Sequence, residues 1–255
     1  MIGVLRVNDE LGRRLIVILK SYPCSWGRCV FCPFAVEQSV NIRDIIETNN
    51  AVINEALARL AEEDVERVSV FNGSSFHELP LDTVLKLKPL AKGRILDIEE
   101  RSEYVTEDAL RGIVDLLKPE ELVVRVGFEV WDEELREGYL RKGMPNSEVL
   151  RLAKLRRELR ELGLPIKVYV YVLFGIKGIP EDKVMESVRR FKELFDGVIA
   201  VKYRRYFPNH PEEVSVSGEL RKFLEESADL VDWGEGEEWE IGQAPARSSA
   251  EPAHY

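Results

Sequence analysis

Short apolar runs rich in β-branched residues recur along the first 206 residues of the chain and predict buried strands. The first run, 15–19, is continuous and ends before Pro23, as is typical of a strand buried on both faces of a parallel sheet. Runs of this kind predict six strands, at 15–19, 68–71, 94–98, 122–128, 166–174 and 197–201.

Between these runs, apolar residues recur at spacings of three and four, which predicts helices. Thr106 opens one of them with a good N-cap pattern, and Gly163 and Pro165 end another. The predicted helices cover 42–61, 81–90, 106–119, 132–142, 147–163, 180–194 and 218–230.

Six strands that are each followed by a helix predict an α/β fold with right-handed crossovers. Six units fall short of the eight that close a full barrel, so we expect a partial (βα)6 barrel with an open parallel sheet. A doubly wound sheet is the alternative. In either fold the site lies at the carboxyl ends of the strands. We expect the barrel over 1–206, a C-terminal helical extension over 207–232 and an acidic, flexible tail over 233–255.

The net charge of −10 over the 255 residues is unevenly distributed. From Phe207 onward there are twelve acidic residues against three basic ones, so residues 1–206 are nearly neutral. The acidic balance is therefore a property of the C-terminal part, and it does not exclude a locally basic substrate site in the body. Hydrophobic residues make up 45% of the chain, which rules out wholesale disorder.

The chain has no N-terminal apolar signal core and no apolar run near the ~20 residues that span a bilayer. We therefore expect a cytoplasmic protein without a membrane partner. The three cysteines lie within nine residues of one another, and such clustering is typical of metal binding in a reducing compartment.

Cys24, Cys29 and Cys32 have the spacing C-x4-C-x2-C, directly after the first predicted strand. A structural zinc needs a fourth ligand, and His77, His210 and His254 are all distant in sequence. Three thiolates on a four-iron cluster leave one iron open for another ligand. A zinc completed by a remote histidine, or a pair of core thiols, is the alternative interpretation.

The segment from Cys24 to Cys32 resembles the cluster loop of radical S-adenosylmethionine (SAM) enzymes, including the aromatic Phe31 before the last cysteine. The commonest spacing in that superfamily is C-x3-C-x2-C, and this chain has one extra residue in the first gap. The resemblance implies a [4Fe–4S] cluster on Cys24, Cys29 and Cys32, with SAM on the open iron. Reduction then releases a 5′-deoxyadenosyl radical, which is chemistry of the cofactor.

Further segments after successive strands resemble the branch of this superfamily that is similar to the elongator catalytic subunit. Residues 71–76 resemble its Gly-Ser-Phe loop, 99–105 its Glu-Ser-Arg-Pro-Glu-Tyr segment, and 127–129 its Gly-Leu-Glu. Lys142-Gly143 also matches. The resemblance implies backbone contacts to the SAM amino group after strand two, an arginine on the SAM carboxylate and a glutamate on its ribose or amine. The implied SAM-binding residues are Gly73, Ser74, Ser75, Glu99, Arg101 and Glu129.

Within that branch, the resemblance extends to an archaeal group that includes the archaeosine-synthesis radical SAM enzyme, which acts on a tRNA base. Basic and aromatic residues alternate over 202–206, at the end of the sixth strand, where they can hold phosphate and stack bases. A solvated strand end explains them equally well. His77 is a candidate proton donor or a polar loop residue, and no residue is assigned a catalytic role.

Three functions remain open. The first is a radical SAM enzyme that modifies tRNA, with an external electron donor such as a ferredoxin, flavodoxin or reductase, and with a partner transferase. The second is a radical SAM enzyme for a small metabolite or peptide. The third is a non-enzymatic Fe–S or zinc binding module, which predicts no SAM binding.

Overall fold

A computed structural model describes residues 2–62 and 64–234 of the chain. Its strands form one eight-stranded sheet in sequence order, so the sheet is open between its first and last strands. The first two strands are antiparallel and all later neighbours are parallel. The strands are β1 (Gly3–Asp9), β2 (Gly12–Leu19), β3 (Arg67–Asn72), β4 (Ile95–Glu100), β5 (Glu121–Glu129), β6 (Ile166–Phe174), β7 (Gly197–Lys202) and β8 (Leu230–Asp232).

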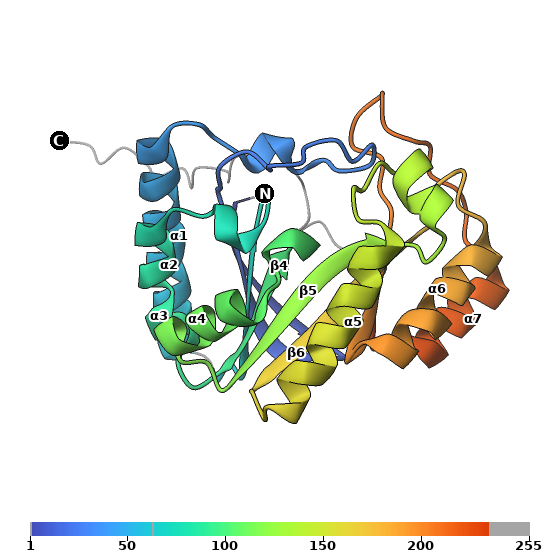
Figure 1. The fold of residues 1–255 in the computed structure, drawn as a ribbon. Helices are drawn as coiled ribbons and strands as arrows, with labels where there is room; N and C mark the ends of the chain where they lie inside the picture. The colour runs from blue at the N-terminus through green and yellow to red at the C-terminus, as the bar shows by residue number, and fades with distance from the viewer. Residues whose placement is uncertain (1, 63, 235–255) are drawn as a thin grey trace.

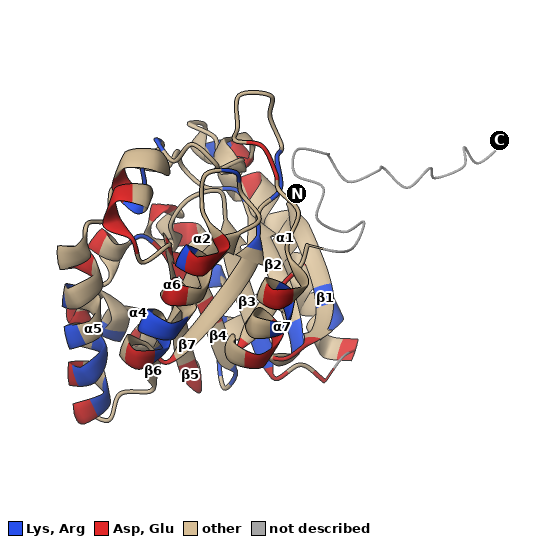
Figure 2. Cartoon of the chain, turned by 90° about the vertical axis from the view of Figure 1, so that its right-hand side faces the viewer, with Lys and Arg blue, Asp and Glu red and all other residues tan. Residues whose placement is uncertain are grey.

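The helices cover the outer face of the curved sheet (Figure 1). The ribbon of helix α5 is coloured both blue and red in Figure 2, where Lys and Arg are blue and Asp and Glu are red, as expected for a solvated helix face. No helix in the described part of the chain is both long and apolar enough to span a membrane. The helices are α1 (Ile42–Glu62), α2 (Leu81–Lys86), α3 (Lys88–Ala91), α4 (Glu107–Leu117), α5 (Asn146–Glu161), α6 (Glu181–Leu194) and α7 (Gly218–Ser227).

The prediction of a partial barrel with an open parallel sheet is confirmed, and all six predicted strands are present as β2–β7. Two further strands were not predicted. Strand β1 is a partly exposed edge strand joined to β2 by a two-residue hairpin, and β8 has only three residues. The helix predicted over 218–230 was too long, because α7 ends at Ser227 and the next residues pair with β7. Of the tail predicted over 233–255, residues 235–255 lie outside the described residues.

Two other predicted helices differ in detail. The helix over 81–90 divides at Leu87 into α2 and α3, with Pro89 near the start of the second helix. The helix over 132–142 is a single π-helical segment, η4 (Glu134–Tyr139). It belongs to the connection between β5 and α5, which also carries Lys142 and Gly143 to the carboxyl edge of the sheet.

The inner face of the sheet carries a buried ion network, whereas the outer face packs apolar side chains against the helices. At the centre, the fully buried carboxylate of Asp97 accepts hydrogen bonds from Arg67 at 2.7 Å and from the Ser69 hydroxyl at 2.6 Å. The guanidinium of Arg125 lies 2.9 Å from the same carboxylate. One acid thus balances two buried arginines on neighbouring strands, and it fixes the floor of the barrel interior.

Asp97→Ala tests how much this buried ion network contributes to stability. Removing one partner of a buried ion pair costs about 3–5 kcal/mol, since it leaves uncompensated charge in the interior. The control is Glu55→Ala, which removes the exposed Glu55–Arg59 pair and costs no more than about 0.5 kcal/mol. Urea unfolding followed by circular dichroism measures both. Equal free energies of unfolding for the two variants would contradict this description of the interior.

Candidate active site

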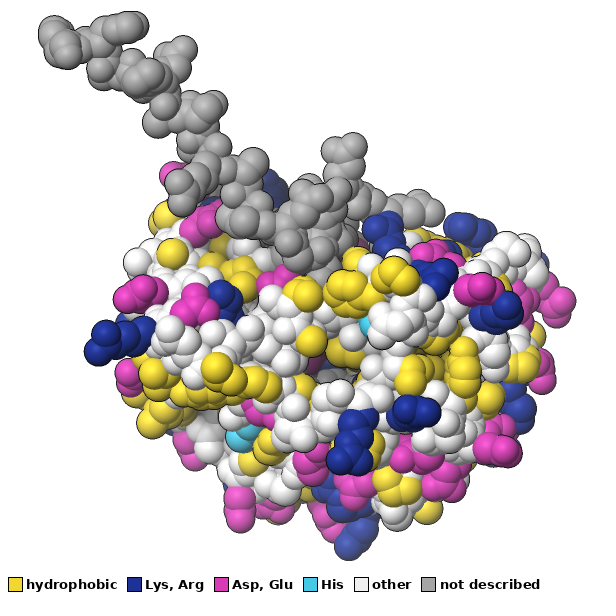
Figure 3. Space-filling model, turned by 90° about the horizontal axis from the view of Figure 1, so that it is seen from above, with side chains coloured by type: hydrophobic (Ala, Val, Ile, Leu, Met, Phe, Trp, Pro, Cys, Tyr) yellow, Lys and Arg dark blue, Asp and Glu magenta, His cyan; other side chains and the backbone are white. Residues whose placement is uncertain are grey.

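A cavity of about 380 Å³ lies at the carboxyl edge of the sheet. Figure 3 looks onto this face, which is hollowed near its centre and carries apolar side chains beside the hollow. The cavity brings together every predicted cluster and SAM residue: Cys24, Cys29, Cys32, Gly73, Ser74, Ser75, Glu99, Arg101 and Glu129. The sequence therefore identified a set of residues that share one cavity, although they come from four separate segments of the chain.

The cysteines lie in a loop, residues 20–33, that contains no helix or strand. Contacts with two other loops hold it. The backbone N–H of Ser25 donates to the carboxylate of Glu78 at 2.7 Å, in the loop after β3. The indole N–H of Trp26 donates to the carbonyl of Arg141 at 2.7 Å, and Val30 N–H donates to the carbonyl of Leu140 at 3.2 Å. The cysteine loop is thus fixed between the loops that follow β3 and β5.

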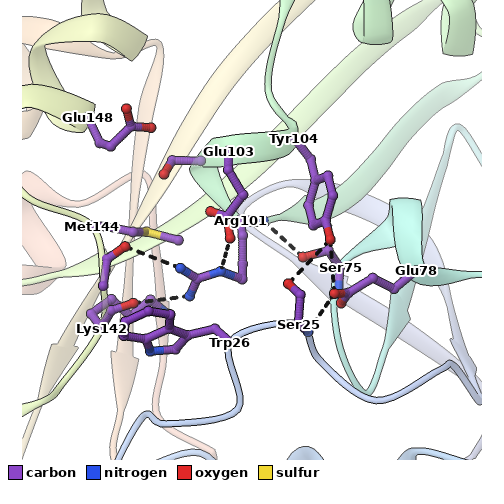
Figure 4. A network of polar contacts seen from close by, with 12 residues as sticks. Ser25, Trp26, Ser75, Glu78, Arg101, Glu103, Tyr104, Lys142, Met144 and Glu148 are labelled. Atoms are coloured by element: carbon purple, nitrogen blue, oxygen red, sulfur yellow. Dashed lines mark hydrogen bonds and ion pairs between the residues drawn. The ribbon is translucent and has the colours of Figure 1, made fainter.

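Trp26 is the main side-chain anchor of the cysteine loop. A Cβ added to Gly143 would lie 2.4 Å from its ring, so only glycine allows this packing. The guanidinium of Arg101 lies 5.2 Å from the ring centre. Arg101 also donates to the carbonyls of Lys142 at 3.0 Å and Gly143 at 3.2 Å, which ties the loop after β4 to the loop after β5 (Figure 4).

The three thiols are free and partly buried, and two of them have raised pKa values. Burial raises the pKa of Cys29 above its ordinary value and that of Cys32 to about 11. In the described residues, no three Cys, His, Asp or Glu side chains converge as ligands of a single metal ion. A [4Fe–4S] cluster has a different requirement, because each thiolate binds its own iron. Three thiols spread around one cavity fit a cluster of several irons.

The loop after β3 uses its side chains to hold its own shape, which leaves its backbone beside the cavity. A Cβ on Gly73 would lie 2.9 Å from the carbonyl oxygen of Glu37, so glycine is required where these backbones meet. The Ser74 hydroxyl donates to that of Ser21 at 2.8 Å. The buried Ser75 hydroxyl accepts from the backbone N–H of Arg101 at 3.1 Å. These serines position the loop.

Arg101 lines the cavity, but several of its donors are engaged within the protein. Besides the two carbonyls, its Nε–H donates to Glu103 at 2.6 Å. A guanidinium has five N–H groups, so two remain for a ligand. Glu99 lies at the end of β4 and accepts from the Tyr171 hydroxyl at 2.6 Å, and burial raises the pKa of its carboxyl group.

Glu129 occupies a strained position at the end of β5. Its φ is +68°, and the pairing of β5 with β6 shifts register between Gly127 and Glu129. Such outliers in the left-handed region persist where the surroundings hold them, and they cluster at functional sites. The Glu129 carboxylate accepts from Lys142 Nζ at 2.8 Å, and both side chains are buried. A Cβ on Gly127 would lie 2.3 Å from this carboxylate, so Gly127 provides its space.

Lys142 brings a positive charge to the cysteines. Burial lowers its pKa, but the charges of Glu129, Cys29 and Cys32 outweigh burial and hold the pKa above its ordinary value. Its ammonium also lies 5.4 Å from the centre of the Phe31 ring in the cysteine loop. In the sequence, Lys142 stands out only as part of a resemblance, and its contact with Glu129 is not predicted.

A second cavity of about 240 Å³ occupies the barrel interior. Its polar wall includes Arg14, Arg125 and Tyr171, and its apolar wall includes Phe71 and Ile199. It shares seven lining residues with the cavity at the cysteines: Phe31, Phe34, Asn72, Glu99, Arg125, Glu129 and Tyr171. The two cavities are therefore neighbours, separated by the side chains of Glu99, Glu129 and Tyr171.

The structure divides the basic and aromatic segment over 202–206. Arg204 and Tyr206 line the interior cavity, whereas Arg205 is exposed and donates to the carbonyl of Pro208. Tyr203 also lines this cavity; its ring is 3% exposed and its hydroxyl donates to the carbonyl of Pro211 at 2.9 Å. Lys202 Nζ lies 3.4 Å from the Glu213 carboxylate, so the field of its positive charge is offset by that acid.

His77 lines neither cavity. Its Nδ1 contacts the carboxylate of Glu100, and its ring stacks on Tyr104 with 5.5 Å between centres. The Glu100 partner raises the pKa of His77, and burial raises the pKa of Glu100 to about 7. These contacts favour the interpretation of His77 as a polar loop residue.

No family model matches the chain, but two curated relatives do. The archaeosine synthase subunit beta of Methanosarcina acetivorans is 25% identical over 201 residues, which are 74% of this chain and 56% of that protein. An uncharacterized protein of Methanocaldococcus jannaschii is 26% identical over 176 residues, which are 64% of this chain and 47% of that protein. The chain thus spans about half the length of these curated relatives.

Solved structures share the fold. A queuine lyase from Clostridium spiroforme, bound to SAM and queuine, has a TM-score of 0.69 and 23% identity, with coverage of 91% of this chain and 94% of that one. The coproporphyrinogen III oxidase of Escherichia coli, a radical SAM enzyme, has a TM-score of 0.54 and 12% identity, with coverage of 83% and 50%. The chain therefore has the fold of these proteins.

Gly143→Ala tests the anchoring of the cysteine loop. It adds a Cβ that clashes with Trp26, so we expect faster amide hydrogen exchange over 24–33. Gly163→Ala is a matched control, because both glycines have φ of +66° but nothing lies within 4 Å of a Cβ at Gly163. Both variants carry the strain of about 1–2 kcal/mol for a left-handed alanine. Unchanged exchange over 24–33 in Gly143→Ala would show that Trp26 does not hold the loop.

Proposed function

We propose that this chain is a radical SAM enzyme. The observation that carries the proposal is the position of Cys24, Cys29 and Cys32, which line one cavity at the carboxyl edge of a barrel with the fold of radical SAM enzymes. These residues hold a [4Fe–4S] cluster, and the cavity beside them binds SAM. When reduced, the cluster supplies the electron that cleaves SAM to methionine and a 5′-deoxyadenosyl radical.

The protein's own residues bind and orient SAM in this proposal. The backbone of Gly73, Ser74 and Ser75 faces the SAM amino group, since the serine side chains are engaged elsewhere. The two remaining N–H groups of Arg101 bind the SAM carboxylate. Glu129 accepts from the ribose or amine, while the hydrogen bond from Lys142 holds its carboxylate in place. Glu99, with its Tyr171 partner, faces the shared wall of the cavities.

The interior cavity is the substrate site. It shares a wall with the SAM cavity, so a substrate bound there lies beside the reactive end of SAM. Its volume of about 240 Å³ is below the range typical of drug-sized ligands, which suits a single ring system better than a folded peptide. Its aromatic lining offers faces for a planar ring.

The substrate class that we propose is a modified nucleobase, in tRNA or free. The similarity to an archaeosine synthase subunit, at 25% identity, favours a base in tRNA. The queuine-bound lyase supports a free base, since the chain covers 94% of that protein but about half of the tRNA-related relative. An external electron donor of the flavodoxin, ferredoxin or reductase kind supplies the electron, and the further partner is a tRNA substrate or a partner transferase.

Anaerobic reconstitution tests the proposal. The protein should bind about four irons with sulfide, and after reduction with dithionite it should convert SAM to 5′-deoxyadenosine. Cys29→Ser should lose both properties. Queuine and tRNA purified from cells, which carries modified bases, are added separately, because the true substrate class accelerates SAM cleavage. A chain that binds one zinc without sulfide and produces no 5′-deoxyadenosine would contradict the proposal and would favour a metal-binding module without enzymatic activity.

A further inference from the structure

Four basic side chains line the interior cavity, and three of them already have acidic partners. Arg14 donates to Asp9 at 2.9 Å, Arg125 lies 2.9 Å from Asp97, and Lys202 lies 3.4 Å from Glu213. The fourth is Arg204. Its guanidinium makes no ion pair and no hydrogen bond with any residue in 2–62 or 64–234.

Arg204 is nevertheless held in a defined position. It is half-buried, just beyond the carboxyl end of β7, and it lies close to Gly234, where an added Cβ would be 2.9 Å from Arg204 Nε. Gly234 has φ of +63°, and its N–H donates to the Asp232 carboxylate at 2.8 Å. Trp233 packs on Phe174 and under Arg221, which fixes this end of the described chain.

A positioned guanidinium that has no acidic partner among the described residues, and that lines a cavity, is suited to an anion. Arginine presents paired N–H groups that match phosphate oxygens. The cavity behind it has apolar and aromatic walls, including Phe71, Ile199 and Tyr206. A ligand that fits both features has a planar ring inside and a phosphate beside Arg204. Asp232, which lines the same cavity, weakens long-range attraction of polyanions, so the contact with Arg204 must be local.

We propose that Arg204 binds the phosphate of the substrate, and that the substrate unit is a nucleoside 5′-phosphate whose base enters the barrel. This inference rests on the proposed function and specifies its substrate. The phosphate belongs either to a free nucleotide or to a residue within RNA. Arg205, although adjacent, has no part in this site, because it is exposed and does not line the cavity.

Calorimetry with the full-length holoprotein tests the inference. The probes are the four nucleoside 5′-monophosphates, the four nucleosides and an unmodified tRNA transcript. We expect at least one phosphate-bearing probe to bind more tightly than its nucleoside. Arg204→Gln should weaken that binding about tenfold to a hundredfold, the range for a hydrogen bond to a charged group, and leave nucleoside binding unchanged. Arg205→Gln is the matched control and should bind like the wild type.

Each outcome decides the inference. Dependence of monophosphate binding on Arg204 supports a free nucleotide, and dependence of tRNA binding alone supports a residue in RNA. Equal weakening by Arg204→Gln and Arg205→Gln, no effect of Arg204→Gln, or no binding of any probe overturns the inference. SAM binding by the wild type is measured in the same samples. If the wild type binds SAM, only the inference about Arg204 has failed. If it does not bind SAM, the proposed function has failed.

Discussion

The cysteine loop has no helix or strand of its own, and its position depends on two neighbouring loops. Glu78 holds it on one side through the Ser25 N–H, and the Arg141 carbonyl holds it on the other through Trp26. Everything proposed for the site follows from this constraint, because the thiols can share a cavity with the strand ends only while both contacts persist. The loops that provide these contacts therefore matter as much as the cysteines.

Buried arginines give those loops their shape. Arg136 is fully buried in η4 and donates to the carbonyls of Val130 at 2.8 Å, Trp131 at 3.0 Å and Met144 at 2.6 Å. It thereby closes the connection from β5 to α5 into a compact loop that presents the Arg141 carbonyl. Arg101 ties the same loop to the end of β4. An arginine can do this because its five donors satisfy several backbone carbonyls at once.

Local patterns in the sequence identified the parallel strands, since these depend on residues close together in the chain, whereas the cavity residues were identified through a resemblance to a known family. What the sequence missed depends on distant contacts. The packing of Trp26 on Gly143 joins residues far apart in the chain, and the strained φ of Glu129 depends on pairing with β6. Tyr203 lies in a basic, aromatic segment of the chain. Its ring is buried, and its hydroxyl donates a hydrogen bond to a carbonyl eight residues away. The roles of the cavity residues toward SAM remain predictions.

The central claim is that the three cysteines leave one iron of a cluster open to SAM. Electron paramagnetic resonance of the anaerobically reconstituted, dithionite-reduced protein tests it most directly. The account predicts the signal of a reduced [4Fe–4S] cluster whose g-values shift when SAM is added, because SAM becomes a ligand of the cluster. A cluster signal that SAM leaves unchanged, or a reconstituted protein without any cluster signal, would contradict the account.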